Sequence, residues 1–156
     1  MPHPVTDPMG HSYGVREQPV VLGERCLPRD WARVEEYLYG VDLLNAAFFW
    51  EAHESWESVW HAVERSSVVG RFLQGLIQSS AALLQHHCGH RLGAANLLER
   101  SRSNLEPAHE WLAAGHRSDF MGVPLEPWQE TVGAYLSGDP APGAEAPFPF
   151  LVLAVD

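Results

Sequence analysis

Residues 53–57, with the sequence HESWE, form the densest group of chemically capable side chains in this chain of 156 residues. An α-helix repeats about every 3.6 residues, so side chains three or four positions apart share a face. On that spacing, Glu57 lies four residues from both His53 and His61, and Glu54 lies on the adjoining stripe. The spacing therefore predicts two imidazoles and two carboxylates within reach of one another.

These residue types suit two kinds of chemistry. Neutral imidazole and carboxylate oxygen both bind divalent cations such as zinc, manganese or iron, which makes a divalent metal the candidate cofactor. A carboxylate can also act as a general base in a hydrolase-like reaction if burial beside tryptophan makes it more basic. The candidate metal ligands are His53, Glu54, Glu57 and His61, and the candidate general bases are Glu57 and Glu54. The alternative is a purely structural cluster, a salt-bridged polar helix face beside a tryptophan-rich core.

Amide and indole side chains are expected around this cluster. Gln74 and Gln78 are four residues apart on a later helix, and Asn45 precedes the helix that carries His53. Buried amides need hydrogen-bond partners, so these side chains either line a small polar pocket or belong to a solvated helix face. The candidate pocket residues are Asn45, Trp56, Trp60, Gln74 and Gln78.

Several familiar active sites are excluded by spacing. The zinc-protease motif needs two histidines four residues apart, and Glu57 stands where the second would be. A ferritin-like di-metal site needs two Glu-x-x-His pairs, whereas this chain has one, Glu106 to His109, interrupted by Pro107. Nucleophile elbows and phosphate-binding glycine loops are missing from the sequence. Three further histidines around Gly89 are expected to be exposed turn residues, namely His86, His87 and His90.

The apolar pattern predicts the helices that position these residues. Apolar residues at helical spacing predict helices over 30–46, 48–64, 67–88 and 124–136, with Asp30 capping the first and Ser66 or Ser67 the third. A fourth helix begins near Arg91, and Pro107 either kinks it or begins a new segment. Short loops favour antiparallel neighbours, so we expect an all-α fold, a compact antiparallel bundle of four to five helices. Gly40 marks either a close helix contact or a local irregularity.

The ends of the chain have a different composition from its centre. Residues 1–27 are rich in proline and glycine and predict an irregular N-terminal arm. Residues 28–137 form the single helical domain, and residues 138–156 form a Pro-rich linker and an extended tail that can lie against the bundle. No role is assigned to either end.

The charge balance narrows the classes of partner. Twenty acidic and ten basic residues give a net charge of -10, which repels nucleic acids and anionic lipids, so neither is an expected partner. The apolar runs are too short to span a membrane, and Cys26 and Cys88 are expected to be reduced thiols in a cytoplasmic protein. A homo-oligomer or a protein partner is the alternative function, with four tryptophans as interface anchors, Trp31, Trp50, Trp111 and Trp128.

The sequence also resembles a known family. The resemblance rests on Asn45, the run Glu51-Ala52-His53-Glu54, Trp56, Glu57 and Trp60, the run from Gln74 to Gln78, and Gly93-Ala94. With these features, residues from about 30 to 115 resemble the domain of unknown function 309 family. The resemblance implies a compact α-helical bundle and no established reaction. Two positions depart from the pattern, because Ala46-Ala47 stand where a glycine is expected and His90 stands where asparagine is usual.

Overall fold

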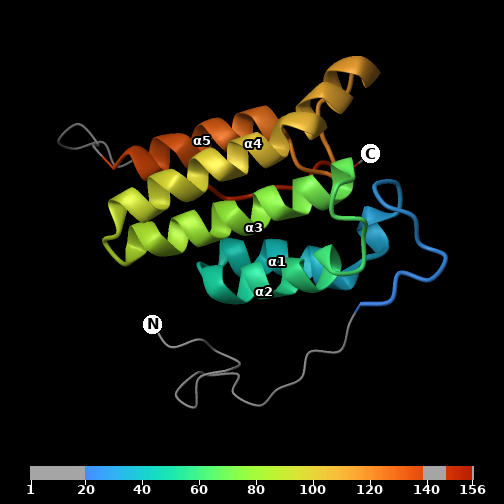
Figure 1. Ribbon diagram of the computed structural model, residues 1–156, viewed down its shortest axis with the longest axis horizontal. Helices are drawn as coiled ribbons and strands as arrows, with labels where there is room; N and C mark the ends of the chain where they lie inside the picture. Colours follow the sequence, from blue (N-terminus) through green and yellow to red (C-terminus); the bar gives the residue numbers. More distant parts are fainter. Residues whose placement is uncertain (1–19, 139–146, 156) are drawn as a thin grey trace, which may run out of the picture.

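The computed structural model describes residues 20–138 and 147–155. Within these ranges the chain is all-helical, and its only extended pairing is an isolated bridge between Phe120 and Val123. The elements are η1 (Trp31–Arg33), α1 (Glu35–Asn45), α2 (Phe49–Trp60), α3 (Val68–His87), α4 (Arg91–Gly115) and α5 (Leu125–Ser137) (Figure 1). The predicted fold class is confirmed. The predicted arm lies mostly outside the described residues.

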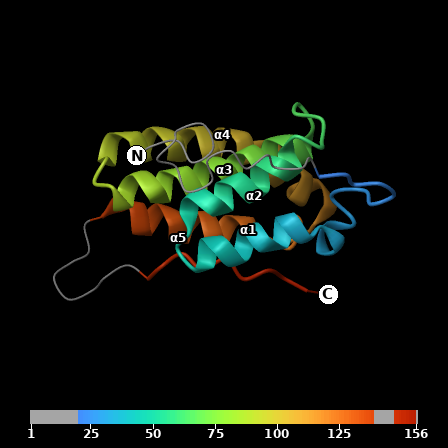
Figure 2. The ribbon, with the colours of Figure 1, turned by 90° about the horizontal axis from the view of Figure 1, so that it is seen from below.

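Helix α3 is the centre of the bundle (Figures 1 and 2). It packs against α4 on one side and α2 on another, while α1 packs on α2. Small residues on α3 let α4 approach closely, because a Cβ added to Gly75 would lie 2.6 Å from Leu105 Cδ2. At the same contact, Ser101 Oγ donates to the carbonyl oxygen of Gly75 at 2.8 Å. The interface between α3 and α4 is therefore closely packed and partly polar.

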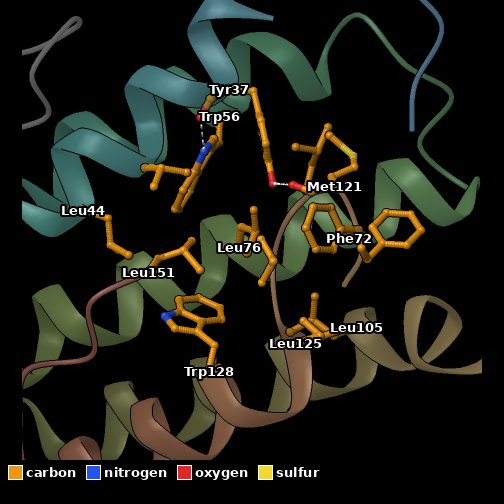
Figure 3. Close-up of a cluster of buried hydrophobic side chains, with 14 of the residues drawn as sticks. Tyr37, Leu44, Trp56, Phe72, Leu76, Leu105, Met121, Leu125, Trp128 and Leu151 are labelled. Carbon is orange, nitrogen blue, oxygen red and sulfur yellow. Dashed lines mark hydrogen bonds between the residues drawn. The ribbon is translucent and has the colours of Figure 1, made fainter. Parts of the chain in front are cut away.

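Helices α1 and α2 meet through Gly40 and Trp56. A Cβ on Gly40 would lie 2.7 Å from Trp56 Cε2, so only glycine leaves room for the indole. The indole Nε1 donates to the carbonyl oxygen of Tyr37 at 3.1 Å, and the Tyr37 hydroxyl donates to the carbonyl oxygen of Met121 at 2.8 Å (Figure 3). The close helix contact, one of the two roles predicted for Gly40, is the one observed.

The first predicted helix is interrupted near its start. Asp30 was expected to cap it, but its carboxylate makes no cap hydrogen bond and instead accepts from the backbone N–H of Cys26 at 2.7 Å. Only a short 3-10 turn follows, and Val34 is extended before α1 begins. The expected cap at Asp30 is therefore wrong, because a nearer backbone donor competes for the carboxylate. Ser67 does cap α3, with Oγ accepting from Gly70 N at 3.0 Å.

Helix α4 continues through Pro107, which was expected to kink it or to begin a new segment. Proline has no N–H, so it leaves the carbonyl oxygen of Ser103, four residues earlier, without its helical donor. Arg71 on α3 supplies a replacement, because its Nη2 donates to that oxygen at 2.7 Å. A side chain from the neighbouring helix thus takes over a backbone hydrogen bond.

The C-terminal tail, residues 147–155, lies extended across the bundle between α1 and α5. Leu151 is 1% exposed and points into the core between Leu44 and Trp128 (Figure 3). Trp128 Nε1 donates to the carbonyl oxygen of Pro149 at 3.3 Å, and Ala154 N donates to that of Gly122 at 2.7 Å. The tail is therefore part of the folded core. None of the described helices is long and apolar enough to cross a membrane.

Candidate functional site

Helix α2 separates an apolar face from a polar one. Its fully packed positions face α1 and α3, namely Phe49, Ala52, Trp56 and Val59. Ser55 beside them donates to the carbonyl oxygen of Glu36 on α1 at 2.6 Å, which fixes the rotation of α2 about its axis. His53, Glu54 and Glu57 are consequently held at the boundary between the core and the solvent, where each is partly buried.

His53 and Glu57 form the central contact of this face. His53 Nε2 lies 3.3 Å from Glu57 Oε2, and the two side chains are 20% and 40% exposed. The other ring nitrogen, Nδ1, lies 2.9 Å from the carbonyl oxygen of Trp50. Burial lowers the pKa of His53, but the hydrogen bonds to Glu57 and Trp50 and the negative charges of Glu57 and Glu54 outweigh it, so the pKa is raised.

The two contacts favour the charged form of the ring. A neutral imidazole has one N–H donor and one acceptor nitrogen, yet both nitrogens of His53 face oxygen acceptors. Two donors are available only in the imidazolium form. The geometry therefore fits a positively charged His53 beside an ionised Glu57, a pair that holds a proton at the helix surface.

The four candidate metal ligands do not gather around one point. Glu54 accepts a hydrogen bond from Trp50 Nε1 instead, and His61 is exposed, with its ring 5.1 Å from the Trp60 ring. Across residues 20–138 and 147–155, no three His, Cys, Asp or Glu side chains are placed to hold a metal ion. His53 and Glu57 meet, but neither Glu54 nor His61 completes a metal centre with them.

The candidate pocket residues also separate into different contacts. Trp56 is fully buried between α1 and α2. Asn45 binds the tail, donating from Nδ2 to the carbonyl oxygen of Leu151 at 2.9 Å and accepting from Leu151 N at 2.8 Å. Gln78 accepts from Asn104 Nδ2 on α4 at 2.8 Å, while Gln74 is half-buried on α3. Asn45, Trp56 and Gln78 therefore make structural contacts outside the His53–Glu57 pair.

Trp60 has a feature that the sequence did not reveal. Its Nε1 is buried and has no hydrogen-bond partner, the one such side-chain atom among the described residues. The guanidinium carbon of Arg65 lies 4.4 Å from the centroid of the Trp60 ring. Arg65 belongs to the turn that follows α2, so helical spacing gave no signal for it.

The four tryptophans proposed as interface anchors are not equivalent. Trp128 is 3% exposed and belongs to the core, whereas Trp111 is 39% exposed. Trp31 and Trp50 are half-buried. Burial therefore excludes Trp128 as an anchor.

A separate hollow lies between α4 and α5, with a volume of about 900 Å³. Its lining includes Glu106, His109, Gln129 and Glu130, and His109 Nε2 is hydrogen-bonded to Gln129 Oε1 across it. None of the candidate site residues of α2 lines this hollow.

Comparison with known proteins supports the relationship expected from the sequence. Residues 37–97 match the family described as domain of unknown function (DUF309). The matched segment covers most of α1, all of α2 and α3 and the first turns of α4, so it contains the whole polar face of α2. No curated protein matched the chain.

Proposed function

We propose that the polar face of α2, which lies inside the segment 37–97 that matches the domain of unknown function 309 family, binds a small ligand. The observation that carries this proposal is the His53–Glu57 pair, in which a half-exposed carboxylate is held 3.3 Å from a mostly buried imidazole. Charged groups at the edge of a core are costly to hold there, and binding sites are a common reason for keeping them. The structural alternative predicts no ligand at all.

Glu57 is the proposed contact for the ligand. It is 40% exposed, so a ligand at the surface can reach its carboxylate, while His53 fixes the position of that carboxylate from the buried side. The ring of His53 is in turn fixed by Trp50. A positioned carboxylate loses less freedom on binding than a mobile one, which favours affinity. Glu54, beside this pair, is the second proposed contact and the alternative general base.

A metal-dependent form of the function requires ligands from outside the chain. His53, once it has lost its proton, and Glu57 would supply two protein ligands, whereas a catalytic zinc site normally has three. Water or a substrate would have to complete the coordination. The proposal is therefore a ligand-binding site in which a divalent cation is one class of ligand to test.

The test follows the ring resonances of His53 by NMR during separate titrations with methylguanidinium, acetate and Zn²⁺. We expect one of these probes to shift the His53 signals saturably in the wild type and more weakly in Glu57→Gln. His109→Gln, which changes a histidine away from α2, is the matched control and should respond as the wild type does. If no probe shifts His53 at millimolar concentration, the polar face is structural and the proposal fails.

Metal content provides a separate readout. The untagged wild type and the His53→Ala/Glu57→Ala variant are compared by elemental analysis after purification. Stoichiometric metal in the wild type that is lost in the variant would make the metal the ligand. Sub-stoichiometric metal in both proteins would exclude a metal ion as the ligand. Binding of another small ligand would then be decided by the NMR titration.

Self-association is the second candidate function, because the tail leaves apolar side chains outside. Phe48 is 55% exposed, and Phe150 and Val152 on the tail are 60% and 74% exposed. A second copy that covered these side chains would remove their apolar surface from water. Light scattering should then give a dimer for the wild type and a monomer for Phe150→Ser, whereas a wild-type monomer at all concentrations counts against it.

A further inference from the structure

We propose that the ligand of the α2 face carries a guanidinium group, and that Arg65 occupies the place of this group when the ligand is absent. The inference rests on the proposed function, because it names the class of ligand that the same face takes. Three observations carry it: the stacking of Arg65 on Trp60, the lack of an ion pair to Arg65 within the described part of the chain, and the charge of α2.

The first observation is the position of the Arg65 guanidinium. Its central carbon lies 4.4 Å from the centroid of the Trp60 ring, within the range of a cation–π contact. A guanidinium is planar and weakly hydrated, so it stacks on an indole more readily than a compact ammonium does. The Trp60 ring thus already binds a guanidinium, that of Arg65.

The second observation is how weakly Arg65 is held there. Arg65 is exposed, and none of the salt bridges among the described residues includes it. It also lies in the turn between α2 and α3, outside both helices. A side chain that stacks without an ion pair can be displaced by a ligand that offers the same group and makes an additional contact.

The third observation is the charge of the surrounding helix. Between residues 49 and 64 the chain has four glutamates and no lysine or arginine, so the segment stays net negative even with a protonated His53 beside Glu57. Glu57 precedes Trp60 by three residues, so the carboxylate and the indole lie on the same face of α2. A guanidinium that stacks on Trp60 can therefore pair with Glu57, the contact that distinguishes a ligand from Arg65 itself.

The experiment measures the indole N–H resonance of Trp60, assigned with Trp60→Phe, during titration with methylguanidinium at constant ionic strength. N-methylurea has nearly the same shape without the charge and is the matched control probe. We expect a saturable shift with methylguanidinium and none with N-methylurea. Glu57→Gln should weaken the binding.

Arg65→Ala provides the decisive variant. Removing the internal competitor should tighten methylguanidinium binding roughly two- to five-fold, the change that a surface cation–π contact corresponds to. Arg102→Ala, which removes an arginine paired with Glu99 on α4, should leave the affinity unchanged. Unchanged or weaker binding in Arg65→Ala would overturn the proposal, and so would an equal shift with N-methylurea.

The outcomes also separate this inference from the proposed function. If acetate or Zn²⁺ shifts His53 and methylguanidinium shifts neither His53 nor Trp60, the α2 face binds a different ligand class and only the inference falls. If none of the probes shifts either residue, both fall together.

Discussion

The guanidinium of Arg71 donates from Nη2 to the carbonyl oxygen of Ser103 at 2.7 Å, across the interface between α3 and α4. This is the acceptor that Pro107 leaves without a helical donor. The pair explains how a proline lies inside a 25-residue helix that continues past it. It also makes Arg71 and Pro107 energetically dependent on one another.

Arg71→Ala removes this hydrogen bond and a longer one, at 3.4 Å, from Nε to Asn104 Oδ1, so it should lower the free energy of unfolding by about 1 kcal/mol or more. In a Pro107→Ala background the alanine N–H can bond to the carbonyl oxygen of Ser103, so Arg71→Ala should lower the free energy of unfolding by less. Urea unfolding of the four proteins gives the coupling between the two sites, expected to be about 0.5 kcal/mol or more. Equal costs in both backgrounds would show that Arg71 does not replace the missing donor.

Gly40→Ala should destabilise the fold by about 2 kcal/mol or more, because the added methyl meets the Trp56 indole and overpacks the contact between α1 and α2. Gly133→Ala on α5 is the matched control. A Cβ on Gly133 meets only the end of the Arg102 side chain, at 3.4 Å. Because alanine favours a helix more than glycine does, Gly133→Ala should raise the free energy of unfolding by about 0.5 to 1 kcal/mol. Thermal unfolding of both variants measures the difference. A tolerated Gly40→Ala would contradict the packing described.

Ala47 is a position where glycine should improve the protein. Its φ is +63°, in the left-handed region that a Cβ disfavours. Its N–H bonds to the carbonyl oxygen of Leu44, and Phe48 N–H bonds to that of Leu43, so α1 ends in a Schellman motif. Ala47→Gly should stabilise the fold by about 0.5 to 1 kcal/mol. Ala46→Gly, at φ -90°, should not, and urea unfolding of both variants checks this contrast.

The pKa of His53 should depend on Glu57. In the wild type the pKa is raised above its ordinary value of 6.5, and Glu57→Gln removes the ion pair while burial remains. We expect the pKa to fall in that variant, as measured by an NMR titration of the ring. His86, whose pKa is lowered by burial and by the charges of His87 and Arg91, should titrate below 6.5 in both proteins.

The same shift has a consequence for stability. Because the folded pKa of His53 is above the unfolded one, its contribution is fully present below about pH 6.5 and is lost as the pH rises through the folded pKa. The difference in unfolding free energy between the wild type and His53→Gln should therefore shrink from pH 6 to pH 8. A difference that grows from pH 6 to pH 8 would mean that folding lowers the pKa of His53 instead of raising it.

Asn45→Ala should loosen the tail from the bundle. The change removes two hydrogen bonds to the backbone of Leu151, which together contribute about 1 to 3 kcal/mol. Hydrogen exchange at the Leu151 amide should become faster than in the wild type, with Asn96→Ala, at an exposed position of α4, as the control. Unchanged exchange at Leu151 would mean that other contacts hold the tail.

Periodicity alone predicted most of the helices of this protein, although it missed the interruption before α1 and left the course of α4 at Pro107 open. The spacing of apolar residues located α2, α3 and α5 to within a few residues, because one buried stripe per helix is a local property of the chain. The same reasoning placed His53 and Glu57 four residues apart on one face, where they form an ion pair. The helix predicted over 67–88 ends where expected, since Gly89 follows α3 at φ +78°.

The tertiary structure decided which polar groups meet when they are far apart in the sequence. Asn45 was expected near His53 but binds Leu151, 106 residues away, and Gln78 was expected to face α2 but binds Asn104 on α4. The rotation of each helix about its axis selects such partners, and rotation is set by packing across the core rather than by spacing along one helix. For the same reason only the structure could bring Arg65 over Trp60, since a turn has no period that fixes where its side chains point.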